Sequence, residues 1–232
     1  MKKVYHTHIH NPIPGLRLLE EPLVRYFREK KRRFNGLEVD NYFACPAHKE
    51  LFKNTYIVKS DVDVHLQTNN GTLSCLDKSQ EWFDEFIGYA NLSENNEYEI
   101  AQFNFSNHLF FSQESVTITM TPAFNNSELL GVYGTYDVSK WFRRVRPAIL
   151  IPQNSEVKIS KGDPLFYLTF SEPVELIPFE HNDELGSLER DCLTLKTVYG
   201  KGYPTPLRKI YSWFTEKKMN ARIMRIINEQ QQ

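Results

Sequence analysis

The chain has 232 residues, of which 41% are hydrophobic and 13% aromatic, and its formal net charge is −1. This length allows one large or two small domains with a sizeable core. A net charge this close to zero argues against a nucleic-acid binder that is basic over its whole surface. Binding of nucleic acid would need a local basic patch, and it stays an open question. The many Phe and Tyr residues favour β-sheet.

The cysteines Cys45, Cys75 and Cys192 are far apart and odd in number, and no CxxC pair occurs. A disulfide framework is therefore not expected, and reduced thiols in a cytosol are the natural interpretation. No apolar run has the length of a signal peptide or of a membrane span, which needs about 20 residues. We therefore expect a soluble protein made in a cytoplasm, with no membrane partner.

Residues 1–41 predict an N-terminal arm made of a strand and a helix. The strand, within residues 1–15, ends at the prolines of residues 11–15, because proline cannot donate a hydrogen bond to a sheet. Residues 20–33 predict a helix with Pro22 at its first position, and its acidic start and basic end complement the helix dipole.

Residues 42–180 predict an antiparallel β-sandwich or jelly roll. In residues 62–67 and 116–121 apolar and polar side chains alternate with a period of two, which is typical of a half-buried strand. Asn70-Gly71 is a strong hairpin signal. The predicted strands lie within residues 54–60, 61–68, 100–106, 116–122, 147–152, 156–160 and 165–170.

The expected core of this body consists of apolar side chains from those segments and from the chain around them. It comprises Phe103, Phe105, Phe110, Val116, Ile118, Met120, Ile149, Ile151, Leu165, Tyr167 and Phe170.

Residues 181–232 predict a loop followed by a C-terminal helical extension, and the chain as a whole is expected to form one domain. Residues 186–206 are ambiguous and end in a loop rich in Gly and Pro. Residues 205–230 predict a helix with one apolar stripe. The stripe slips near Lys217 and Lys218, so a division into two helices within residues 217–220 is an alternative.

The first candidate site is a histidine triplet near the N-terminus, which consists of His6, His8 and His10. In a strand these imidazoles share one face at a spacing of about 6.5 to 7 Å, and HxH on a strand is a common pair of metal ligands. The simpler interpretation is a partly exposed terminal strand. No cofactor is expected except a divalent metal at these histidines.

A second metal site would bring His65, His108 and His181 together, as in a cupin-like enzyme that uses non-haem iron or zinc. The HxD pair that such enzymes use occurs as His181 and Asp183, in a polar loop rather than at a recognisable strand end. Walker, GxGxxG and GxSxG motifs are absent from the sequence, so phosphate-cradle and serine-hydrolase interpretations lack support.

Residues 137–147, DVSKWFRRVRP, mix aromatic and basic residues most densely. They predict a binding surface for a protein partner or a small anionic ligand, because Trp and Arg are enriched at binding hot spots and guanidinium groups pair with anions. The surface would be centred on Trp141, Arg143, Arg144 and Arg146. The simpler interpretation is a corner whose Trp caps the core while the arginines stay solvated.

Two segments resemble an uncharacterised β-sandwich family of tailed phages, notably marine phages. Residues 42–66 contain its Cys-Pro turn and the following strand, and residues 109–170 contain YDVSKWFRR and the KGDP turn before an apolar strand. Arg144 stands where proline is commoner in that family. The resemblance implies a phage protein in the host cytoplasm or the virion, and it implies no established activity.

A second resemblance concerns VKISKGDPLFYLTF, which is similar to a turn and core strand of the dUTPase and dCTP-deaminase jelly-roll group. The uracil-binding motifs of that group are not recognisable. The leading hypothesis is therefore a non-catalytic, phage-encoded protein that binds a ligand or belongs to the virion. A metal-dependent enzyme and a nucleotide-binding jelly-roll protein are the alternatives, and the oligomeric state is left open.

Overall fold

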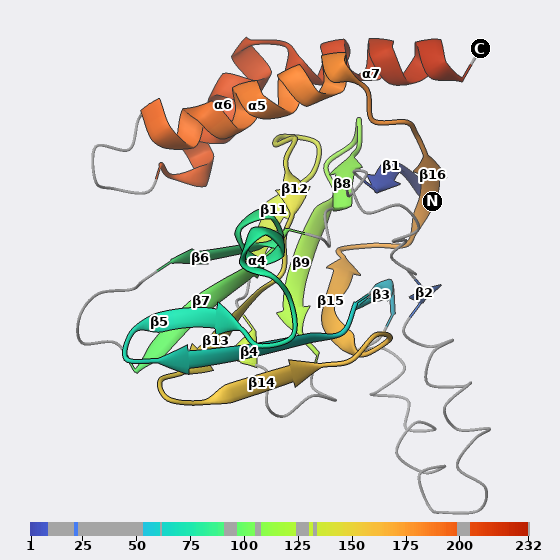
Figure 1. Cartoon of the computed structure of the whole chain (residues 1–232). Coiled ribbons are helices and arrows are strands. Elements are labelled where there is room, and N and C mark those ends of the chain that lie inside the picture. Colours follow the sequence, from blue (N-terminus) through green and yellow to red (C-terminus); the bar gives the residue numbers. More distant parts are fainter. Residues whose placement is uncertain are drawn as a thin grey trace, which may run out of the picture.

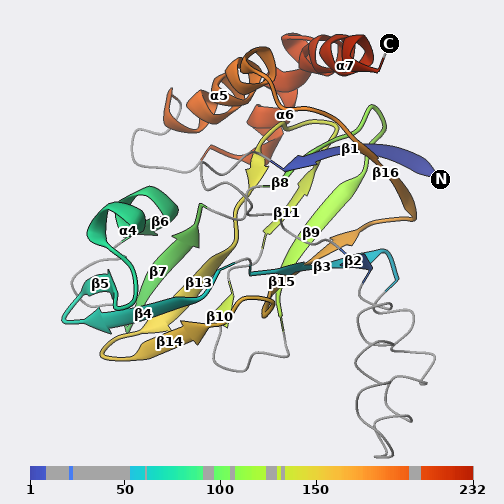
Figure 2. The ribbon, with the colours of Figure 1, turned by 45° about the vertical axis from the view of Figure 1, so that its right-hand side comes forward.

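The computed structural model describes residues 1–8, 21–22, 53–60, 62–90, 97–104, 108–123, 130–131, 134–198 and 205–231. These residues form a mainly β protein with several sheets and a smaller helical part. Figures 1 and 2 show the helices of the C-terminal part gathered at one end of the β body. Among the helices of this described part, none combines the length and the apolar character that crossing a membrane requires.

Two of the sheets are antiparallel throughout, as the alternating pattern predicts. One has the order β11 (Gly134–Asp137), β9 (Thr117–Pro122), β15 (Pro164–Phe170), β3 (Thr55–Lys59) and β2 (Glu21–Pro22). The other has the order β10 (Leu130–Gly131), β13 (Ala148–Pro152), β7 (Tyr98–Phe103) and β6 (Ile87–Ala90). The apolar strand β15 lies between β9 and β3, and all but one of its side chains are buried.

A third antiparallel sheet has the order β14 (Glu156–Ile159), β4 (Val64–Asn69) and β5 (Thr72–Cys75). The predicted hairpin joins β4 to β5. Asn70 and Gly71 have positive φ angles of 49° and 77°. A two-residue turn with positive φ at both positions matches the twist of the strands, which is why Asn-Gly is favoured there.

The fourth sheet brings together strands that are far apart in the sequence. Its order is β12 (Arg144–Val145), β8 (His108–Phe111), β1 (Lys2–His8) and β16 (Val174–Pro178). The pairing of β1 with β16 is parallel, whereas β1 with β8 and β8 with β12 are antiparallel. The predicted N-terminal strand therefore exists, and it lies between two strands of the β body, where an outlying arm had been expected.

The predicted start of the N-terminal helix is wrong. Glu21 and Pro22 form β2 and pair with Ile57 and Tyr56 of β3. An edge strand tolerates proline, because the missing N–H need not face a neighbour. The remainder of the predicted helix, residues 23–33, lies outside the described residues.

The C-terminal part contains α5 (Asp183–Val198), α6 (Leu207–Glu216) and α7 (Met219–Gln230), which contact one another. The alternative of two helices within residues 205–230 is confirmed, and Lys218 at the break has a positive φ of 51°. Helix α5 begins before the ambiguous segment, residues 186–206, and the first half of that segment is therefore helical. A short helix, α4 (Gln80–Phe86), was not predicted; the side chain of Ser79 caps it by accepting from the backbone N–H of Trp82.

The predicted core is largely confirmed. Nine of its eleven members are buried, Met120 is half-buried, and Phe105 lies outside the described residues. Residues that the prediction left out complete the same cluster, among them Phe111, Phe142, Phe214 and Ile227. The last two come from α6 and α7, so the helices contribute to one continuous core with the sheets.

Candidate functional site

His6 of β1 packs against aromatic rings. Nε2 of His6 lies 3.4 Å from Nδ1 of the fully buried His108, and the two rings are stacked with centroids 5.7 Å apart. The ring of His6 also stacks on Phe110, at 4.9 Å. His8 pairs with His108 in the strand register. The side chain of His8 and the whole of His10 lie outside the described part, so the metal-binding triplet stays a prediction.

The alternative cupin-like cluster does not form, because each of its histidines has a different neighbour. His65 contacts Glu156 of β14 at 2.8 Å, His108 stacks on His6, and Nε2 of His181 lies 3.6 Å from Glu189. No group of three or more His, Cys, Asp or Glu side chains within the described ranges could hold a metal ion. The prediction that His65, His108 and His181 come together around a metal ion is therefore wrong.

The tight turn in residues 137–140 leads from β11 into the segment of aromatic and basic residues. Oδ1 of Asp137 accepts hydrogen bonds from the backbone N–H and the hydroxyl of Ser139, at 2.9 and 2.7 Å. Oδ2 accepts from the Ser115 hydroxyl at 2.6 Å and lies 3.1 Å from Nζ of Lys140. Burial would raise the pKa of Asp137, but these hydrogen bonds lower it overall. The ionised carboxylate thereby fixes the turn that precedes Trp141.

Trp141 is 6% exposed and caps the core, as the simpler interpretation of this corner predicts. Its ring meets Tyr136 edge to face, with centroids 5.7 Å apart and an interplanar angle of 76°. The guanidinium of Arg143 lies over both rings, 4.6 Å from the centroid of Trp141 and 6.0 Å from that of Tyr136. The indole is thus covered, and it does not offer an open face as an interface hot spot would.

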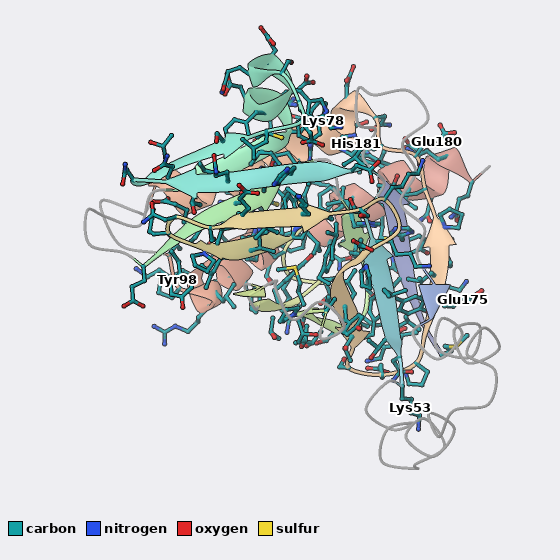
Figure 3. All side chains as sticks on the ribbon, turned by 60° about the horizontal axis from the view of Figure 1, so that its bottom comes forward. Lys53, Lys78, Tyr98, Glu175, Glu180 and His181 are labelled. Carbon is teal, nitrogen blue, oxygen red and sulfur yellow. The ribbon has the colours of Figure 1, made fainter. Side chains whose placement is uncertain are left out.

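Arg144 connects the sheet to the helices. Its Nε donates a 2.7 Å hydrogen bond to Oε1 of Glu189, which is buried in α5. His181 lies near the other carboxylate oxygen, and Figure 3 shows His181 beside Glu180, where the chain leaves β16 for α5. Burial would raise the pKa of Glu189, but the contacts with His181 and Arg144 lower it overall. Glu189 is therefore an ionised group with two basic neighbours.

Arg146 is half-buried, and it makes no hydrogen bond or ion pair with any residue that the structure describes. Burial, and then repulsion by Arg144 and Arg143, lower the pKa of Arg146, whereas Glu189 opposes the shift. All three arginines of this corner are half-buried, which differs from the solvated state of the simpler interpretation. Within the described residues Glu189 interacts with both Arg144 and Arg146, so these two cations share one acid.

The sequence analysis named Trp141 and the arginines of this corner, and it missed Glu189 and Tyr136. Glu189 was overlooked although it lies in an apolar helical stripe with Leu185, Leu188 and Cys192, all of which are buried. A carboxylate in such a stripe is expected to be buried against a basic partner. Tyr136 gave no signal of its own, because aromatic residues are common in strands.

Comparison of the chain with protein-family models finds no match, and no curated protein matches it either.

Proposed function

We propose that this protein is a non-catalytic binding protein, and that Arg143, Arg144 and Arg146 form its site for a small oxyanion. The observation that carries the proposal is the environment of the Arg146 guanidinium. Its guanidinium is half-buried, is repelled by two other arginines and lacks an acidic side chain within hydrogen-bond reach in the described residues. A partly desolvated cation is costly unless an anion compensates it.

The chemistry of these side chains suits phosphate or carboxylate. Guanidinium groups present several N–H donors in a fixed plane and bind such oxyanions through two parallel hydrogen bonds. Glu189 accepts from Arg144, so the acid of this corner is engaged in an ion pair and is a poor candidate for a general base. This engagement supports the non-catalytic part of the proposal.

The proposal includes the biological setting. The resemblance of residues 42–66 and 109–170 to a tailed-phage family supports a phage protein of the host cytoplasm or of the virion. The antiparallel pairing within most sheets supports a sandwich of the jelly-roll type. Mass spectrometry of purified virions tests the structural role: a protein that copurifies at constant stoichiometry is part of the particle, and its absence assigns it to the infected cell.

Thermal unfolding with increasing inorganic phosphate tests the site. Phosphate at 100 times its dissociation constant should stabilise the protein by about 2.7 kcal/mol. The variant Arg146→Gln should lose this stabilisation. Lys158→Gln is the matched control, because Lys158 is an exposed cation in β14. Equal responses of the two variants would show that phosphate acts by general screening and would refute the site.

A further inference from the structure

Beside the arginines lie two buried polar groups that no protein group satisfies. Tyr136 is 9% exposed and Trp141 6%. Neither the Tyr136 hydroxyl nor the Trp141 Nε1–H has a hydrogen-bond partner among the described residues. Buried polar groups are nearly always paired, and leaving one unpaired costs as much as its full desolvation. Two such groups on rings in contact are therefore unlike ordinary core packing.

Arg143 belongs to the same cluster, since its guanidinium lies over both rings. Its Nε donates to the backbone carbonyl of Arg144 at 3.1 Å, and within the described ranges no carboxylate pairs with its terminal nitrogens. Indole N–H and guanidinium groups can only donate hydrogen bonds. Burial raises the pKa of Tyr136, which keeps its hydroxyl protonated and able to donate.

The neighbouring groups do not supply the missing acceptor. The Tyr211 hydroxyl accepts from the backbone N–H of Asp137, and Nζ of Lys140 lies over the Tyr211 ring at 5.8 Å. Both oxygens of Asp137 are engaged by Ser115, Ser139 and Lys140. Tyr136, Trp141 and Arg143 thus lie in one cluster of contacting side chains, in which the Tyr136 and Trp141 donors lack an acceptor among the described residues. The complementary group is an acceptor with several oxygen lone pairs.

We infer that the Tyr136 hydroxyl, the Trp141 indole N–H and the Arg143 guanidinium form the inner, selective end of the oxyanion site and bind the ligand's phosphate or carboxylate oxygens. This inference rests on the proposed function for the presence of the ligand and adds the two aromatic donors to its recognition. Each donor would make a hydrogen bond to a charged acceptor, the stronger class of hydrogen bond.

The test follows the indole N–H signals in ¹H–¹⁵N NMR spectra while inorganic phosphate, or separately acetate, is added. The chain has three tryptophans, and Trp141→Phe assigns the relevant signal. We expect the Trp141 N–H signal to move downfield and those of Trp82 and Trp213 to stay in place. A response to phosphate alone assigns a phosphoryl ligand, and a response to acetate alone assigns a carboxylate.

Tyr136→Phe removes one donor and keeps the ring. It should weaken anion binding roughly tenfold or more, because a hydrogen bond to a charged group is lost. Without anion, the variant should melt at the same temperature as the parent or higher, since an unpaired buried hydroxyl has gone. Tyr98→Phe in β7 is the matched control and should bind like the parent.

Two results would overturn the inference: a Trp141 signal that moves with neither anion, or a Tyr136→Phe variant that binds as tightly as the parent. The arginine site has its own readout, the loss of phosphate stabilisation in Arg146→Gln. Loss of stabilisation together with an unchanged Trp141 signal would therefore reject the aromatic donors and leave the proposed function intact.

Discussion

The ion pair of Arg144 and Glu189, with 2.7 Å between Nε and Oε1, ties the edge strand β12 to helix α5. The carboxylate is buried, whereas a pair of the same length between Arg225 and Glu184 lies at the exposed surface. The two pairs differ in burial and share their chemistry. They therefore allow a direct comparison of a buried and an exposed ion pair in one protein.

We predict that Glu189→Gln lowers the free energy of unfolding by about 3 kcal/mol, because it leaves the cation of Arg144 without its buried partner. Glu184→Gln, the matched control, should cost less than about 1 kcal/mol, as is usual for exposed pairs. Chemical denaturation of both variants gives the two values. Equal losses would mean that the pair of Arg144 and Glu189 does not fasten α5 to the sheet.

The carboxylate of Glu189 should also make the free energy of unfolding depend on pH. The folded protein holds the pKa of Glu189 below its ordinary value of 4.5, so the pair stabilises the fold above that value. This contribution is lost as the pH falls through the folded pKa, since the unfolded chain then binds more protons. Unfolding measured between about pH 6 and pH 3 should show a shallower decline for Glu189→Gln than for the parent, and parallel declines would contradict the assignment.

Asp137→Asn should loosen the turn before Trp141. The change removes the negative charge of the carboxylate, which accepts hydrogen bonds from Ser139 and Ser115 and pairs with Lys140. It should lower the free energy of unfolding by roughly 1 to 3 kcal/mol. The near-ultraviolet circular dichroism of the tryptophans should change with it. Asp191→Asn, at an exposed position of α5, is the control and should leave both stability and spectrum as they are.

Gly71→Ala should destabilise the hairpin of β4 and β5 by about 1 kcal/mol, because alanine is strained at a φ of 77°. Gly134→Ala in β11 is the matched control: its added Cβ meets only Met120 Cε at 4.0 Å, and its φ is not positive. That substitution should be neutral or slightly stabilising. Thermal denaturation compares the two, and an equal effect would show that the turn does not require glycine.

The sequence correctly predicted those elements whose signal lies within a short stretch of the chain. Strands such as β4 and β9 follow from alternation, the hairpin at Asn70 follows from turn chemistry, and the break at Lys218 follows from the slip in an apolar stripe. Helix α4 was missed because its short sequence, QEWFDEF, is rich in aromatics that also favour strands. Its helical signal is Ser79, a residue that favours the N-cap, followed by the acidic Glu81 in the first turn, and the prediction overlooked it.

The site shows the same limit. The concentration of arginines is visible in the sequence, but the burial of Trp141 depends on the packing of Tyr136 and Arg143 around it. The pairing of Arg144 with Glu189 joins residues 45 positions apart and has no local signature. The parallel contact of β1 with β16 is likewise beyond periodicity, which gives the faces of a strand but not its neighbours.

The place of β1 has a consequence for how the protein is made. Its partners begin at His108 and Val174, so β1 is synthesised long before both of its partner strands, and its sheet can close only after Val174 has been made. Pairings across such distances slow folding, because the entropy of closing a long loop precedes the gain from contact. Until then Val4 and Tyr5, which are buried in the finished protein, remain in water.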